Sequence, residues 1–383
     1  MKKALIALFI ASLSIAIYFF STKNSYQNLH YFTPLAKSFL QAKLDVEPSP
    51  QLNELVPFQD KHYVVYPPMP AVALVPFVAV FGETFNQKWA SIIIAGLSVA
   101  LFYLLLDRFT TKKWIKVSLT ALLGFGTNFY FTSLSGTSWY FAHVCAVFFS
   151  ILSLLLASSK RPFLSGLFLG ASFLSRLPTI LNFPILLYLL FEKIDKKNRA
   201  GVLTNFCAAV FLAIIIYGLY NFFRFGSVAE TGYSLIPGIM DEPWFSKGVF
   251  DFSYLFRNLK AAFASFPQIS THFPYFVPSN YATAIYISTP ALVLLLLTKI
   301  REGRVLFLIL SVILSSLPGL THATVGFTQF GYRFSLDYIV LLILILVFSF
   351  QKVGWKIALP LVGISIAINL YVVYLYKLGI FGY

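Results

Sequence analysis

The stretch NLHYFTPLAKSFLQAKLDV (residues 28–46), followed by a polar run and then by YPPMPAVALVPFVAVFG (residues 66–82), lies between a first apolar span and a long series of further apolar spans. It is too long for a tight connection between two helices. It also carries most of the His, Asp and Glu residues in the first quarter of the chain. We therefore expect this stretch to form a cap on one side of a polytopic membrane protein.

The composition supports that class. Of the 383 residues, 58% are hydrophobic and only 11% are charged, and the mean hydropathy is +0.78. A water-soluble core cannot hide that much apolar surface. The apolar runs are about 17 to 24 residues long, which is the length that a helix needs to cross roughly 30 Å of hydrocarbon. This length excludes a β-barrel and predicts an all-α polytopic membrane protein with a single transmembrane domain over residues 1–383.

About eleven transmembrane helices are predicted. They lie near residues 4–20, 88–107, 114–131, 138–158, 162–176, 178–192, 200–223, 282–298, 304–320, 334–350 and 355–376. A single long kinked helix also fits residues 162–192. The basic residues on either side of that segment favour a hairpin, because they then lie on the same side of the membrane.

The Pro-rich segment 67–82 is interpreted as a helix that does not span. With that choice, the cytoplasmic segments carry 17 Lys and Arg against 4 Asp and Glu, and the outer segments carry 12 against 10. This is a strong positive-inside pattern, so the net charge of +15 reflects topology and predicts no nucleic-acid partner. The N-terminus is expected in the cytoplasm, on an uncleaved anchor or, alternatively, behind a removed signal peptide. The C-terminus is expected outside.

Two large outer loops follow from this topology, at residues 21–87 and 224–281. The first is expected to hold two juxtamembrane helices, at 34–44 and 67–82, with Thr33 as the N-cap of the first. Asp60 to His62 is expected to form a turn between two short strands. The second loop contains an amphipathic helix whose Phe-rich face opposes Arg257, Asn258 and Lys260. Gly166 and Gly170 form a GxxxG pattern, which predicts close helix packing.

The order of these motifs resembles the membrane-embedded C-class (GT-C) glycosyltransferases, including the protein O-mannosyltransferases and the bacterial aminoarabinose transferases. HYFTPLAKSFLQAKLDV and the Pro-Pro segment resemble the two juxtamembrane helices of that superfamily, and SFLSRLPTILNFP resembles its helix-hairpin turn. YNFFRFGSVAETGY and FGYRFSLDYIVLL resemble two later motifs of a bacterial branch. The resemblance implies transfer of a sugar from a polyprenyl-phosphate carrier, within the lipid bilayer, to a glycan, lipid or protein acceptor on the outer face.

The catalytic residue is where the chain departs from that superfamily. Asn28 stands where the relatives carry a catalytic Asp, and an amide cannot accept a proton from the acceptor. Either His30 or Asp45 takes that role, or the register differs, or the chemistry has changed. The candidate catalytic residues are therefore Asn28, His30 and Asp45. A non-catalytic binder or transporter of polyprenyl lipids is the alternative function.

Five further residues are candidates for binding the substrate or its lipid phosphate: Arg176, Arg224, Glu230, Arg333 and Asp337. Arg176 lies at the turn of the expected hairpin, where a cation is costly unless it is paired or used. The alternatives are snorkelling of Arg176, an ion pair between Arg224 and Glu230, and a helix-surface bridge between Arg333 and Asp337, which are four residues apart. The sequence contains no recognisable metal-ligand set and leaves a divalent metal requirement open. It favours a bacterial inner membrane.

Overall fold

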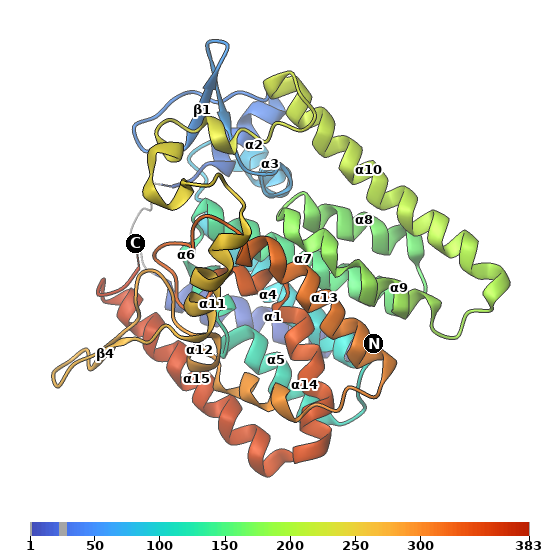
Figure 1. The fold of residues 1–383 in the computed structure, drawn as a ribbon. Helices are drawn as coiled ribbons and strands as arrows, with labels where there is room; N and C mark the ends of the chain where they lie inside the picture. The colour runs from blue at the N-terminus through green and yellow to red at the C-terminus, as the bar shows by residue number, and fades with distance from the viewer. Residues whose placement is uncertain (1, 23–28, 383) are drawn as a thin grey trace.

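Helices dominate the computed structural model, which describes residues 2–22 and 29–382 (Figure 1). The α-helices are α1 (Lys2–Ser21), α2 (Phe32–Leu40), α3 (Met69–Phe81), α4 (Gln87–Leu106), α5 (Lys113–Phe125), α6 (Asn128–Ser135), α7 (Ser138–Ser158), α8 (Pro162–Phe173), α9 (Phe183–Phe191), α10 (Arg199–Phe225), α11 (Leu255–Phe263), α12 (Ile285–Ser288), α13 (Gly303–Leu320), α14 (Ile339–Val353) and α15 (Trp355–Lys377). The strands are β1 (Leu55–Phe58), β2 (Lys61–Val64), β3 (Gln268–Ile269) and β4 (Phe276–Val277). The 3-10 helices that matter below are η1 (Leu177–Asn182), η7 (Pro290–Leu297) and η8 (Arg333–Asp337).

Six helices within residues 2–22 and 29–382 are long and apolar enough to cross a membrane. They are α1, α4, α7, α13, α15 and the helical stretch Lys196–Phe225 that contains α10. The chain is thus a helical integral membrane protein. Each of the other five predicted spans also contains helix, but in shorter or broken pieces. At 1.5 Å per residue such pieces cover only part of the hydrocarbon layer, so eleven spans stays a prediction.

The segment 162–192 forms a hairpin. Lys160, which precedes α8, donates from Nζ to the main-chain oxygen of Glu192, which follows α9, at 2.5 Å. The two ends of the segment therefore lie together, and Arg176 lies between α8 and η1 at the turn. A single kinked helix would have separated those ends, so the hairpin interpretation is confirmed. The main-chain NH of Met69, at the start of α3, donates to the oxygen of Leu174 at 3.0 Å, which places α3 against this turn.

Most of the loops that were predicted to be cytoplasmic meet at one end of the bundle. Lys3 pairs with Asp107 at 2.8 Å, and Arg304 pairs with Glu192 at 2.7 Å. The main-chain oxygen of Arg108 accepts from Arg304 at 3.3 Å, which joins those two groups. At the opposite end, Lys377 donates to the main-chain oxygen of Phe20 at 3.0 Å. The structure thus separates the two sets of loops, and which end faces the cytoplasm stays a prediction.

The first outer loop contains both predicted helices, with one correction. Helix α2 begins at Phe32, one residue before Thr33, so Thr33 does not cap it. The Thr33 hydroxyl instead donates to the main-chain oxygen of Phe85 at 3.2 Å. The start is set by the preceding residue, Tyr31, whose NH donates to Ser138 Oγ at 2.8 Å. Helix α3 has 13 residues, about 20 Å of helix, so it is shorter than the roughly 30 Å of hydrocarbon.

A β-hairpin joins α2 to α3, as expected from the sequence. Strands β1 and β2 pair antiparallel with Phe58 opposite Lys61. Gln59 and Asp60 form the two-residue loop, and both have positive φ, at 48° and 59°. This is the backbone twist that two-residue hairpins favour. The turn therefore lies one residue earlier than the sequence indicated.

Helix α11 in the second outer loop is amphipathic, and Asn258 of its polar side faces the protein. Asn258 is buried and donates to the main-chain oxygen of His322 at 2.9 Å. Phe252 and Phe256, on the other side, are each 79% exposed. An exposed aromatic face is typical of a helix in the membrane interface, and the Asn258 contact fixes segment 321–323 beside α11.

The GxxxG pattern brings α8 against α10. A Cβ atom on Gly166 would lie 2.4 Å from the main-chain oxygen of Phe206, whereas nothing lies within 4 Å of one on Gly201. We expect Gly166→Ala to lower the free energy of unfolding by about 1 to 3 kcal/mol. Gly201→Ala, in open space on α10, is the matched control and should be neutral or slightly stabilising. Thermal unfolding in detergent measures both; equal shifts would contradict the close contact.

Candidate functional site

Arg176 and Asp337 form a bidentate ion pair at the hairpin turn. Arg176 Nε donates to Oδ1 at 3.1 Å and Nη2 donates to Oδ2 at 3.0 Å. The Asp337 side chain is 1% exposed and that of Arg176 is 25% exposed. His143 of α7 places Nδ1 3.2 Å from the same carboxylate. Three segments that are distant in sequence, namely α7, the hairpin and η8, therefore meet at Asp337.

The bridge between Arg333 and Asp337, which was the alternative to a binding role, is not how this carboxylate is paired. Both residues lie in η8, a 3-10 helix with three residues per turn, in which positions four apart do not share a face. The i to i+4 rule holds for an α-helix. Asp337 turns instead to Arg176, which lies 161 positions earlier in the chain.

Arg333 lies among aromatic rings close to Arg176. Its guanidinium carbon is 5.9 Å from the centre of the Trp139 ring, 5.3 Å from that of Tyr140 and 5.8 Å from that of Phe334. The guanidinium carbon of Arg176 is 5.6 Å from the same Phe334 ring. The two cations are therefore no farther apart than the sum of their distances to Phe334. Two guanidinium groups so placed favour an anionic ligand, phosphate above all.

Glu54, a carboxylate of the first outer loop, interacts electrostatically with Arg333, and the sequence analysis missed it. Its Oε2 accepts from Trp139 Nε1 at 3.2 Å and from the hydroxyl of Tyr66. Burial raises the pKa of Glu54 to about 7, while the Trp139 hydrogen bond and the positive charge of Arg333 oppose that rise. Glu54 lies in a polar run with no motif around it, so no local signal marked it.

We call Glu54, Trp139, Arg176, Arg333, Phe334 and Asp337 the outer-end cluster, after the loops beside it that were predicted to lie outside. The second outer loop adjoins it. The His322 ring centre lies 5.6 Å from that of Phe334 and 5.8 Å from that of Tyr233. Burial lowers the pKa of His322 to about 4, so it is neutral at pH 7. Burial raises the pKa of Tyr233, and the Glu54 carboxylate raises it further, which places both in one electrostatic environment.

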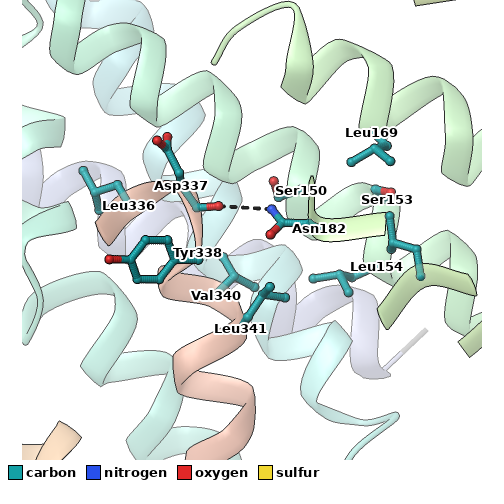
Figure 2. Close-up of a pocket in the computed structure, with 11 residues that line it drawn as sticks. Ser150, Ser153, Leu154, Leu169, Asn182, Leu336, Asp337, Tyr338, Val340 and Leu341 are labelled. Carbon is teal, nitrogen blue, oxygen red and sulfur yellow. Dashed lines mark hydrogen bonds between the residues drawn. The ribbon is translucent and has the colours of Figure 1, made fainter. Parts of the chain in front are cut away.

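A small cavity, with room for about one water molecule, adjoins Asp337 (Figure 2). Its polar lining comes from Ser150, Ser153 and Asn182, among apolar side chains. Asn182 donates from Nδ2 to the main-chain oxygen of Asp337 at 3.0 Å, while its Oδ1 has no hydrogen-bond partner within the described residues. The cavity is too small for a sugar, and the Asn182 hydrogen bond beside it ties η8 to η1.

Of the three catalytic candidates, Asn28 lies outside the described residues. His30 is half-buried in a segment that is held against the start of α7, because Ser138 donates to the main-chain oxygen of Leu29 at 3.1 Å. Asp45 lies beside the β-hairpin, where its carboxylate is 3.4 Å from Lys61 Nζ. His30 therefore lies in a segment that contacts the start of α7, next to Trp139 in the chain. Asp45, in contrast, contacts the β-hairpin.

Arg224 and Glu230 are not brought to the outer-end cluster. Arg224 is 2% exposed, and its Nη1 donates to the main-chain oxygen of Val64 at 2.6 Å while its Nη2 donates to Asn221 at 2.7 Å. Glu230 accepts from the NH of Gly232 at 2.7 Å, and the ion pairs of the described residues do not join it to Arg224. Arg224 ties α10 to β2 in this structure, and its expected role in binding the lipid phosphate stays a prediction.

A metal site has no support in the described part of the chain. Residues 2–22 and 29–382 contain no group of three or more His, Cys, Asp or Glu side chains that could hold a metal ion.

Neither a family model nor a curated protein matches the sequence. Among solved structures, the chain is similar to the S. cerevisiae protein O-mannosyltransferase Pmt1-Pmt2 complex bound to the sugar donor. The TM-score is 0.40 with 13% sequence identity, and the match covers 66% of this chain. The chain aligns with 36% of the length of that protein.

Proposed function

We propose that the chain is a GT-C glycosyltransferase that moves a sugar from a polyprenyl-phosphate carrier to an acceptor of the cell envelope. The observation that carries this proposal is the outer-end cluster, in which the guanidinium carbons of Arg176 and Arg333 lie 5.6 and 5.8 Å from the centre of one ring, that of Phe334. The transfer takes place on the non-cytoplasmic face, and the sequence favours a bacterial inner membrane. The carrier phosphate and the acceptor meet at the turn of the 162–192 hairpin.

The cations of the cluster suit a phosphate that leaves with added charge. Arg176 uses Nε and Nη2 for Asp337, which fixes its orientation and leaves Nη1 for an anion. Arg333 supplies a second positive charge, since its guanidinium carbon lies 5.8 Å from the centre of the same Phe334 ring. Charge that develops on the departing phosphate is stabilised by such preorganised donors. We propose that Arg176 and Arg333 bind the carrier phosphate and that Asp337 orients Arg176.

The acceptor must lose a proton to a base. Of the residues that the sequence put forward, Asn28 is an amide, His30 is half-buried, and the Asp45 carboxylate lies 3.4 Å from Lys61 Nζ. An amide at Asn28 is also the specific observation that favours the second candidate function, a non-catalytic binder or transporter of polyprenyl lipids. Both functions require the phosphate site, and only the enzyme requires a base.

The test is turnover by the purified full-length protein in detergent or in nanodiscs. A panel of polyprenyl-phosphate sugars is supplied with bacterial envelope fractions as acceptor, and the released carrier phosphate is measured by mass spectrometry. We expect release with at least one donor and loss of an envelope glycan on deletion of the gene. Binding of the lipids without release from any donor, and an unchanged glycan profile, would replace the enzyme by the binder.

A further inference from the structure

We infer that Glu54 is the general base of the transfer, the group that takes the proton from the acceptor. This inference rests on the proposed function. It stands on the position of the carboxylate: Glu54 shares Trp139 with Arg333, because the indole NH donates to Glu54 while the Arg333 guanidinium lies over the ring. The base is thereby held next to a cation that binds the donor phosphate.

The hydrogen bonds of Glu54 leave one carboxylate oxygen for the acceptor substrate. Both side-chain donors, Trp139 and Tyr66, bond to Oε2, and no described residue donates to Oε1. The main-chain NH of Glu54 donates to the hydroxyl oxygen of Tyr31 at 3.0 Å, which fixes the backbone as well. A carboxylate that is oriented through one oxygen and open at the other is the arrangement that a general base needs.

The step balances as follows. The acceptor O–H or N–H gives its proton to Glu54 Oε1, and its freed electron pair forms the bond to the anomeric carbon of the sugar. The bond between that carbon and the phosphate oxygen breaks, and its electron pair leaves on the carrier phosphate beside Arg176 and Arg333. Glu54 then returns the proton to water at the outer face. No oxidant, reductant or further reactant is needed.

A pH profile follows from the same position. Burial raises the pKa of Glu54 to about 7, so the carboxylate is mostly protonated, and unable to act, at lower pH. The titratable and charged groups that face it are Tyr31, Tyr66, Tyr233, Glu242 and Arg333. Activity should therefore rise as the pH increases through about 7. Because the folded pKa is above the value of 4.5 for a free Glu, the folded protein holds a proton that the unfolded chain has lost between about pH 4.5 and 7. Stability therefore falls over that interval and is level above it.

The competing role for Glu54 is structural, as an anchor for Trp139 and Tyr66. Glu54→Gln separates the two roles, because the amide oxygen still accepts those hydrogen bonds but cannot take a proton. Glu54→Asp keeps a base and shortens its reach. Glu47→Gln is the matched control, since Glu47 is an exposed carboxylate of the same loop.

The experiment measures two quantities for each variant: kcat with the active lipid-linked donor, and the Kd for polyprenyl phosphate alone. We expect Glu54→Gln to lower kcat by about 100- to 10,000-fold with an unchanged Kd, and Glu47→Gln to change neither. Glu54→Asp should recover part of kcat and keep a pH-dependent rise. An active wild type whose Glu54→Gln variant keeps its kcat would overturn the inference and leave the proposed function intact. A wild type that turns over no donor would overturn the proposed function, and the inference with it.

Discussion

Replacing Asp337 with alanine is expected to lower the free energy of unfolding by about 3 kcal/mol. The carboxylate is 1% exposed and forms the bidentate pair with Arg176. Removing it leaves a guanidinium in a membrane-embedded protein without the anion that compensates for its lost hydration. We expect a value near the lower end of those measured for broken buried pairs, because a quarter of the Arg176 side chain remains exposed.

A variant that lacks both charges isolates the pair. The doubly substituted Arg176→Met/Asp337→Leu protein removes both charges and should recover much of the stability that Asp337→Ala loses. Glu83→Ala is the control: Glu83 pairs with Lys37 at the surface, where both side chains are well exposed, and should cost less than about 1 kcal/mol. Unfolding is followed by thermal denaturation in detergent. Equal losses for Asp337→Ala and Glu83→Ala would contradict a buried pair.

The same double variant separates folding from function. Its predicted stability is close to that of the wild type, but it lacks the oriented guanidinium of Arg176. A stable protein that no longer binds polyprenyl phosphate would assign the pair to the site. A stable protein with normal binding would leave Arg176 as a structural residue.

The sequence predicted those features that depend on length, hydropathy and charge alone. The 162–192 hairpin followed from Lys160 and the basic residues after Glu192, because the positive-inside rule acts on loops without regard to their tertiary contacts. The GxxxG pattern likewise predicted the close packing of α8, which the contact of Gly166 with Phe206 confirms. Such signals are local in the chain, so they can be read without the fold.

The set of residues that meet at the site could not be predicted from such local signals. Asp337 has a cation four residues away, yet the 3-10 geometry of η8 turns it towards Arg176, which is distant in sequence. Arg224 follows a predicted span much as a phosphate-binding Arg would, yet α10 packs so that its donors face Val64 and Asn221. Glu54 stands in an ordinary polar run, and only the contact of that run with Trp139 gives it chemistry. Long-range packing decided each of these cases.

Arg333→Ala is expected to weaken binding of polyprenyl phosphate by about 10- to 100-fold, which is the usual contribution of hydrogen bonds to a charged partner. The residue is 8% exposed and held among Trp139, Tyr140 and Phe334. Arg333→Lys should lose less affinity, because it keeps the charge but not the planar set of donors that matches a phosphate. Arg301→Ala, an exposed Arg from the opposite end of the bundle, is the control and should change nothing.

The measurement is a titration of each variant in nanodiscs with a short-chain polyprenyl phosphate, followed by tryptophan fluorescence and repeated over a series of salt concentrations. The salt series distinguishes a site from surface attraction, since screening weakens exposed charges far more than buried ones. If Arg333→Ala binds as the wild type does, the phosphate is not held at Phe334. Glu54 would then have no lipid-linked sugar donor bound beside it. The affinity of this one variant therefore tests whether the base and the leaving phosphate share a site.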